Sequence, residues 1–213
     1  MKYITFSLIL AVLIVNSTIK SQSGANSCKI KLPVLVKNRC DFELLSLTKI
    51  GNFGEPRKAR PTVPAHLHTG IDIKRPSKNY VNEPVYSIYS GKVISVRNDG
   101  PFAQIIIEHV SCKGDKFWSV YEHIAGITVK VGDKVNSESQ IARYMNKNEL
   151  NKFGWQFDHC HLEILKIMPR KIKVNPNLPS RFYSTFNIEC YDKELLNKYY
   201  YNPIEFFRKF ICI

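Results

Sequence analysis

The sequence lacks a hydrophobic run long enough to cross a membrane as a helix. Its most apolar stretch, residues 4–15, is interrupted by Thr5 and Ser7, and a spanning helix needs about 20 apolar residues. With Lys2 before it and small or polar residues after it, this stretch predicts a signal peptide over residues 1–21. An uncleaved membrane anchor is the alternative. We therefore expect a secreted protein, or one of the periplasm or cell envelope.

Acidic residues are few, and patterns for nucleic-acid binding are absent. The chain has 18 Asp and Glu against 31 Lys and Arg, which gives a formal net charge of +13 and a pI near 9.5. A field of this sign attracts anionic polymers. Because no helix-turn-helix, zinc-finger or RNP pattern occurs, we expect no nucleic-acid partner. Anionic wall or envelope polymers remain as partners, and a charge that only keeps the protein soluble is the alternative.

The chain also lacks internal repeats, low-complexity blocks and a dense cysteine framework. Hydrophobic residues make up 44% and charged residues 23%, close to globular averages, which excludes disorder of the whole chain. All six cysteines lie beyond residue 21, where an oxidising compartment permits disulfides. Two bridges are plausible, but six cysteines allow 15 connectivities and the sequence does not choose among them.

From about residue 61 the chain consists of short segments rich in β-branched and aromatic residues, separated by Gly, Asn and Asp. Such punctuation predicts antiparallel sheet. Helical periodicity is weak before residues 193–200 and 203–210, where Asn202 and Pro203 predict the start of the second helix. Residues 22–60 are polar and basic and are predicted to be an N-terminal extension. The predicted strands are residues 84–89, 92–96, 104–109 and 117–123, with residues 129–135 as strand, turn and strand.

Five of the six histidines fall in three compact clusters, and the last cluster contains His159-Cys160-His161. Residues two apart on a strand project to the same side. His159 and His161 therefore share a face, and Cys160 points into the core. Two imidazoles on one face suit a metal ion, although a pair of ordinary surface histidines is the alternative.

The first cluster adds a carboxylate, because Asp72 follows His68 by four residues. Gly70 between them permits a tight backbone path. Two imidazoles and one carboxylate are the set that a catalytic zinc ion prefers, with the fourth position open for water. His66 could replace His68, which we prefer because the Gly70 turn links it directly to Asp72.

These motifs together resemble the M23 (lysostaphin/LytM-like) metallopeptidases. His68-x-Gly70-x-Asp72, Tyr121-x-His123 and His159-x-His161 stand in the order and rough spacing of that family. The segment around Val131-Gly132-Asp133, followed by Gln140-Ile141-Ala142, is also similar. The resemblance covers roughly residues 61–208, and three ordered motifs are far more specific than any one of them.

The resemblance implies a fold, a cofactor and an activity. The fold is all-β or β-rich, with antiparallel sheets that form a groove around a zinc site, and with short C-terminal helices. Zn²⁺ is ligated by His68, Asp72 and His161, and His123 and His159 are the catalytic pair. The implied protein is a zinc metallo-endopeptidase domain over residues 61–213 that hydrolyses the peptide stems or crossbridges of bacterial peptidoglycan. Alternatives are a catalytically silent binding or regulatory module and a metallopeptidase with protein substrates.

Some residues depart from the family pattern or have other roles. The approach to the last motif, residues 154–158, and the turn at residues 98–101 differ from the family and border the expected groove. Residues 166–191 are longer than expected, and are either an insertion near the cleft or a surface loop stapled by Cys190. Glu163 is expected to face away from the zinc side, and His109 to be structural. That residues 22–60 cover the groove as an inhibitory prosegment is a further hypothesis.

Overall fold

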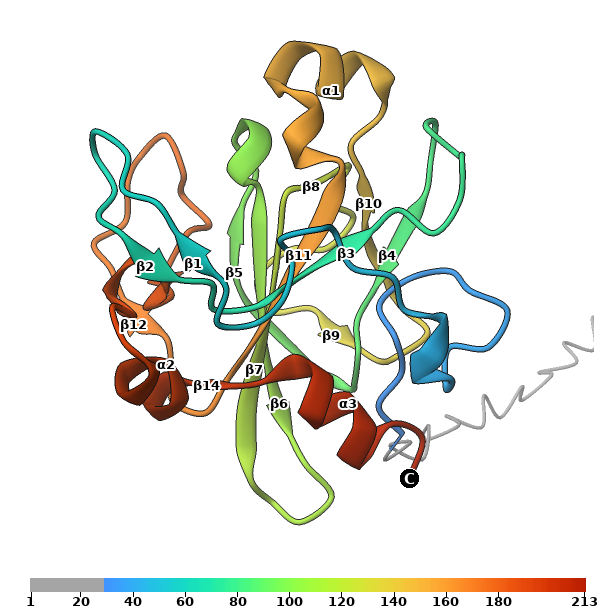
Figure 1. The fold of residues 1–213 in the computed structure, drawn as a ribbon. Coiled ribbons are helices and arrows are strands. Elements are labelled where there is room, and N and C mark those ends of the chain that lie inside the picture. Colours follow the sequence, from blue (N-terminus) through green and yellow to red (C-terminus); the bar gives the residue numbers. More distant parts are fainter. Residues whose placement is uncertain (1–28) are drawn as a thin grey trace, which may run out of the picture.

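The computed structural model describes residues 29–213, which fold mainly into short antiparallel strands (Figure 1). The β-rich architecture predicted from the sequence is confirmed. The strands are β1 (Pro56–Arg57), β2 (His66–Leu67), β3 (Ile71–Lys74), β4 (Pro84–Tyr86), β5 (Gly91–Arg97), β6 (Gln104–Val110), β7 (Lys116–Glu122), β8 (Ile124–Ala125), β9 (Lys134–Val135), β10 (Gln140–Tyr144), β11 (His159–Leu165), β12 (Arg170–Lys171), β13 (Tyr183–Ser184) and β14 (Tyr200–Tyr201). The α-helices are α1 (Lys147–Phe153), α2 (Lys193–Tyr199) and α3 (Pro203–Phe210), and the 3₁₀ turns are η1 (Phe42–Leu44), η2 (Gly100–Phe102), η3 (Trp155–Phe157) and η4 (Asn187–Glu189).

A seven-stranded antiparallel sheet forms the centre of the molecule. Its main path runs β14-β11-β7-β6-β5-β9, and β3 pairs with β11 beside β14. Strand β11 therefore has β7 along one edge, while the other edge is shared by β3 at its start and β14 at its end. A smaller sheet, β4-β10-β8, packs nearby. Because β11 is paired on both sides, its first residues are held in a fixed register.

Both faces of the central sheet carry apolar side chains, as the period of two along a strand requires. On β6, Ile105 and Ile107 join the larger core cluster, whereas Ile106 joins a second cluster with Trp118 and Val120. The face of the second cluster is apolar at one end of the strands only. At the other end the same face carries polar residues, and the candidate site lies there.

Residues from both ends of the described chain pack on the larger core. Ile30, Leu32 and Val34 are buried in it, and a disulfide joins Cys40 to Cys212 with their Cα atoms 5.5 Å apart. Cys112 is also disulfide-bonded. The predicted boundary at residue 61 stays a prediction, and the predicted signal peptide lies outside the described residues. Within residues 29–213, no helix combines the length and apolar character that a membrane crossing requires.

The helices follow the sequence signals only in part. Asn202 caps α3, accepting a hydrogen bond from the Ile204 amide at 3.0 Å, and Pro203 is its first residue, which confirms that prediction. Helix α1 was not predicted, because it is short and mostly polar. Its signal is a capping box, in which Asn146 and Glu149 bond each other's backbone amides. Within residues 129–135 only Lys134–Val135 form a strand, β9, which follows a turn. The predicted first strand of the pair does not form.

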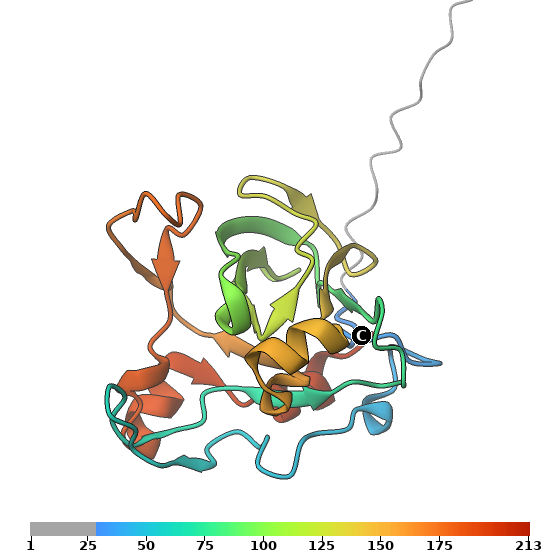
Figure 2. The ribbon, with the colours of Figure 1, turned by 90° about the horizontal axis from the view of Figure 1, so that it is seen from above.

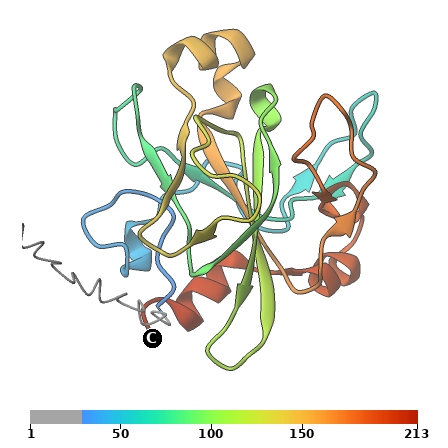
Figure 3. The ribbon, with the colours of Figure 1, turned by 180° about the vertical axis from the view of Figure 1, so that it is seen from behind.

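Two segments far apart in sequence lie side by side at one edge of the molecule (Figures 2 and 3). One is the β1–β2 hairpin, residues 56–67, and the other is the segment 166–191 that contains β12, β13 and η4. The Leu67 amide donates to the Cys190 carbonyl at 2.8 Å and so joins them. Cys190 itself is a buried free thiol. The alternative in which Cys190 staples a surface loop is therefore wrong.

Candidate metal centre

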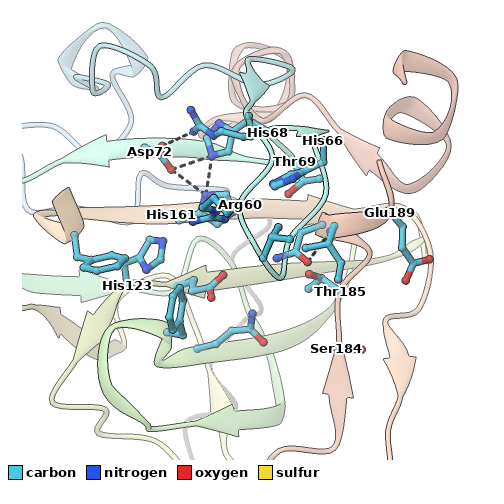
Figure 4. Close-up of a pocket in the computed structure, with 18 of the residues that line it drawn as sticks. Arg60, His66, His68, Thr69, Asp72, His123, His161, Ser184, Thr185 and Glu189 are labelled. Atoms are coloured by element: carbon cyan, nitrogen blue, oxygen red, sulfur yellow. Dashed lines mark hydrogen bonds and ion pairs between the residues drawn. The ribbon is translucent and has the colours of Figure 1, made fainter. Parts of the chain in front are cut away.

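Three of the side chains singled out in the sequence point toward one another (Figure 4). Asp72 is on β3 and His161 on β11, directly opposite it in the ladder, and His68 lies just before β3. His68 Nε2 is 2.9 Å from His161 Nδ1, and Asp72 Oδ1 is 3.0 Å and 2.9 Å from these two nitrogens. Within residues 29–213 this is the only group of three His, Cys, Asp or Glu side chains placed to share a metal ion.

The hydrogen bonds around the cluster leave ligand lone pairs facing its centre. A carbonyl oxygen only accepts, so His68 Nδ1 donates to the Asn52 carbonyl at 2.8 Å and Nε2 is left for a metal. Asp72 Oδ2 accepts from Arg57 Nη2 at 2.8 Å, which leaves Oδ1 for the centre. Tetrahedral zinc with Zn–N bonds of about 2.0–2.1 Å separates its ligand atoms by only a little over 3 Å. The residues present therefore fit a zinc ion.

Glu163 also belongs to this cluster, which corrects the expectation that it faces away. It lies two residues after His161 on β11, so the strand period places both on one face. Glu163 is fully buried, and its Oε1 is 3.3 Å from His161 Nε2 and accepts from the Thr69 hydroxyl at 2.5 Å. His161 Nε2–H donates to this carboxylate, which directs the Nδ1 lone pair to the metal side.

The electrostatics of the cluster favour a positive charge at its centre. Burial lowers the pKa of His161, but hydrogen bonds to Asp72 and Glu163 outweigh it and raise the pKa to about 10. Burial raises the pKa of Asp72, and hydrogen bonds to His161 and His68 outweigh it and hold the pKa well below its usual range. A buried carboxylate pair around two imidazoles thus holds a cation, either a proton or a metal ion that replaces it.

The two histidines predicted to be catalytic lie next to the cluster. His123 follows β7 with a left-handed φ of 61°, a strained conformation for a non-glycine residue. Its Nδ1 donates to the Pro101 carbonyl at 2.6 Å, so Nε2 is the nitrogen that can accept a proton. The rings of His123 and His159 are 4.9 Å apart, and His159 Nε2 is 3.5 Å from Asp72 Oδ1. Burial lowers the pKa of His123 and lowers that of His159 to about 3, so both are neutral near pH 7.

Gly70 serves the site in a different way from the one expected. It has no left-handed φ, so the tight turn is not the reason for it. Instead β3 begins against β11, and a Cβ on Gly70 would lie 2.3 Å from the Leu162 carbonyl oxygen and 2.9 Å from His161 Cε1. Only glycine allows this close approach, and the approach brings Asp72 to His161.

The cluster lies in a cleft of about 950 Å³ with walls from both edge segments. The β1–β2 hairpin contributes Arg60, and the segment 166–191 contributes Thr185 and Glu189 (Figure 4). The segment 166–191 therefore lies at the cleft, as expected, and that it is an insertion stays a prediction. Six residues between positions 50 and 63 also line this cleft, so the N-terminal part of the described chain helps to build it. They are Ile50, Arg57, Lys58, Arg60, Thr62 and Val63.

The remaining histidines lie outside the cluster. His66, the alternative ligand, is in the cleft wall with Nδ1 2.8 Å from the Pro64 carbonyl. His109 is fully buried between the Ser90 carbonyl and the Ser119 hydroxyl, which confirms a structural role. Sequence reasoning missed Arg57 and Asn52, because no spacing rule connects them to the motifs. Glu163 could have been placed from strand alternation.

The chain was compared with protein families, curated sequences and solved structures. Residues 66–176 match the family model of peptidase family M23, whereas no curated protein sequence matches the chain. Among solved structures, a zinc-containing peptidase from Vibrio cholerae shares 26% identity over 64% of this chain and 36% of its own, with a TM-score of 0.44. The catalytic domain of lysostaphin from Staphylococcus simulans shares 20% identity over 78% of this chain and 95% of its own, with a TM-score of 0.45. The catalytic domain of the prophage-encoded M23 protein EnpA from Enterococcus faecalis was solved as a mutant. It shares 22% identity over 72% of this chain and 93% of its own, with a TM-score of 0.42. The chain thus spans little more than a third of the Vibrio protein.

Proposed function

Because the chain belongs to peptidase family M23, we propose that it is a zinc-dependent endopeptidase that hydrolyses peptide bonds in the stems or crossbridges of bacterial peptidoglycan. His68, Asp72 and His161 hold the zinc ion, and His123 and His159 take part in the chemistry. One observation carries this proposal: three ligand atoms within about 3 Å of one another lie in a cleft beside two further histidines. A zinc ion bound there supplies a Lewis acid that polarises the scissile carbonyl and activates water for attack.

His123 is positioned to act as the general base. Its Nδ1–H is committed to the Pro101 carbonyl, so the proton of the attacking water goes to Nε2. Burial lowers the pKa of His123, which keeps this nitrogen unprotonated before the reaction. The proton is then available for the leaving amine.

His159 is positioned to stabilise charge on the substrate. Neutral imidazole carries one N–H donor, and this ring lies between His123 and the metal cluster. A hydrogen bond from His159 to the scissile carbonyl oxygen strengthens as that oxygen gains negative charge. His123 thus acts on the attacking water and the leaving amine, and His159 acts on the scissile carbonyl. Neither is proposed as a metal ligand.

Two features favour a wall polymer as the substrate. Most of the residues that line the cleft are polar, and six of them are Lys or Arg. The net charge of +13 also favours docking on an anionic wall or envelope. We further propose that the protein acts outside the cytoplasm, on the strength of the apolar stretch over residues 4–15.

Hydrolysis of purified peptidoglycan by the zinc-loaded protein tests the proposal. The matched variants are His123→Ala, which keeps the metal ligands, Asp72→Ala, which removes one, and His66→Ala, a cleft histidine outside the cluster. We expect new amine termini by mass spectrometry with the native protein and the His66 variant only. Zinc should be stoichiometric in all but the Asp72 variant.

The same experiment separates the alternatives. Stoichiometric zinc without cleavage of any wall type would contradict the peptidase proposal and favour a binding or regulatory module. Cleavage of a glycine-rich protein without cleavage of peptidoglycan would favour a metallopeptidase with protein substrates. Cleavage by Asp72→Ala would contradict the proposed metal site.

A further inference from the structure

The floor of the cleft is a row of polar side chains that crosses five adjacent strands. In the sheet, each member of the row is the direct cross-strand partner of the next. Directly opposed residues of an antiparallel ladder project to the same face, and all five members line the cleft. The row runs from Asp72 on β3 through His161 on β11, Glu122 on β7 and Gln104 on β6 to Arg97 on β5.

The cleft as a whole carries more basic side chains than carboxylates. Six basic side chains and three carboxylates line the cleft. Three of the basic groups are paired, Arg57 with Asp72, Arg97 with Asp99 and Arg170 with Glu189. In the described part of the chain, Arg181, Arg60 and Lys58 form no side-chain hydrogen bond or ion pair.

Arg181 is held in place beside Arg97 at the β5 end of the row. Both of its neighbours in the chain bond to β5. The Ser180 carbonyl accepts from the Val96 amide at 2.9 Å, and the Phe182 amide donates to Ser95 Oγ at 3.0 Å. The Nε atom of Arg181 is buried without a partner. Burial, and then the charge of Arg97, lower the pKa of Arg181, whereas the charges of Asp99 and Glu122 raise it. Asp99 already binds the Arg97 guanidinium, so Arg181 is the guanidinium at this end that an anion would stabilise.

We infer that Arg181, beside the Arg97–Asp99 pair, forms an anion subsite that binds a carboxylate of an acidic peptide, so that the cleft prefers a substrate with a free carboxyl group to its amidated form. Guanidinium groups bind carboxylates through paired, charge-assisted hydrogen bonds. The inference rests on the proposed peptidase function, because it concerns the substrate of the same cleft.

The row also sets where the carboxylate binds. Glu122 lies between the metal cluster and Gln104, is buried, and makes no ion pair among the described residues. Its charge repels a carboxylate from the middle of the floor. Three strand spacings separate His161 from Arg97, which is about 14 Å or about four residues of extended peptide. The acidic group therefore lies several residues from the scissile bond.

The test measures peptide binding, so that it does not depend on cleavage. Full-length zinc-loaded His123→Ala protein is titrated into two fluorescent peptides that differ in one group several residues from the middle, which is a carboxylate in one peptide and a carboxamide in the other. Arg181→Gln in the same background removes the subsite charge, and Arg181→Lys keeps the charge without the paired donors. Lys113→Gln, at the exposed turn between β6 and β7, removes one charge far from the cleft.

We expect the acidic peptide to bind about tenfold more tightly than the amide, the value of one or two charge-assisted hydrogen bonds. Arg181→Gln should reduce this ratio to near one, Arg181→Lys should restore part of it, and Lys113→Gln should leave it unchanged. Equal binding of the two peptides by the parent protein would overturn the inference. So would an acid preference that survives in Arg181→Gln, because it would place the carboxylate at the metal cluster.

Cleavage separates this inference from the proposed function. The native protein can be given peptidoglycan whose peptide carboxyl groups are free and peptidoglycan in which they are amidated. If it cleaves both equally well, the peptidase function stands and the anion subsite is refuted. If neither wall is cleaved but the acid preference depends on Arg181, the subsite stands and the peptidase function fails.

Discussion

Hydrogen bonds to neighbouring groups decide which atoms of each metal-site residue face the cluster. Asn52 and Glu163 bond the outward nitrogens of His68 and His161, and Arg57 bonds one oxygen of Asp72. Such bonds fix the imidazole tautomer and the ring orientation before any metal arrives. That His68, Asp72 and His161 lie together could be predicted from the motifs and the family resemblance. Asn52 and Arg57 could not, since they come from segments without a recognisable motif.

Replacing Glu163 by Gln should weaken zinc binding while the fold persists. The isosteric amide removes the negative charge that orients His161, and loss of such a partner costs about 10- to 100-fold in metal affinity. Competition with a zinc-binding dye measures the change, with Glu189→Gln as the control, because Glu189 is a cleft carboxylate paired to Arg170. Equal zinc affinities of the two variants and the native protein would contradict the role assigned to Glu163.

His109 should make the protein less stable in mild acid. Burial lowers its pKa from 6.5 to about 4, so between these values the unfolded chain binds a proton that the folded chain excludes. The contribution of His109 to stability is therefore complete above pH 6.5 and is lost as the pH falls toward 4, by about 3 kcal/mol in total. Urea unfolding at several pH values should show a shallower fall for His109→Gln. Parallel pH curves for the two proteins would show that His109 does not titrate in this way.

At the scale of elements, strands were predictable and the short helix was not. Residues 104–109 and 117–122 are rich in β-branched and aromatic side chains, and they became β6 and β7. Helix α1 buries only Leu150, so it leaves no apolar periodicity in the sequence. The strand pairing that places Glu122, Gln104 and Arg97 in one row depends on long-range register, which a single sequence does not reveal.

Substituting Gly70 by Ala should damage both the sheet and the site. The added Cβ would meet the Leu162 carbonyl and push β3 from β11, at a cost of about 2 kcal/mol or more. Zinc affinity should fall as well, because Asp72 moves with β3. Gly114→Ala is the matched control: its Cβ meets nothing, and its left-handed φ costs about 1–2 kcal/mol. Normal zinc binding in Gly70→Ala would refute the close-approach explanation.

At the scale of the whole molecule, the two ends of the described chain close on each other. Ile30 forms a parallel bridge with Ile211, and the Cys40–Cys212 disulfide lies beside it. The extension predicted for residues 22–60 thus shares the larger core through Ile30, Leu32 and Val34. Composition alone suggested a polar extension, because a few apolar residues in a basic segment give no periodic signal.

Removing this disulfide should lower stability without affecting the metal site. The double variant Cys40→Ser, Cys212→Ser opens a loop whose ends are 172 residues apart, and the loss should be about 2–5 kcal/mol. Urea unfolding under non-reducing conditions measures it, and zinc affinity serves as the internal control. Identical urea midpoints for variant and native protein would mean that packing alone holds the two ends together.

The pairing of β11 on both edges has an evolutionary consequence. The backbone bonds of β3, β7 and β11 hold Asp72 and His161, and backbone bonds to Gly54 and Glu55 hold His68, so the scaffold does not depend on an ion. A single substitution at His68, Asp72 or His161 should therefore abolish metal binding and leave a folded cleft. A descendant of such a chain needs no new architecture to keep the cleft as a binding site without the ion.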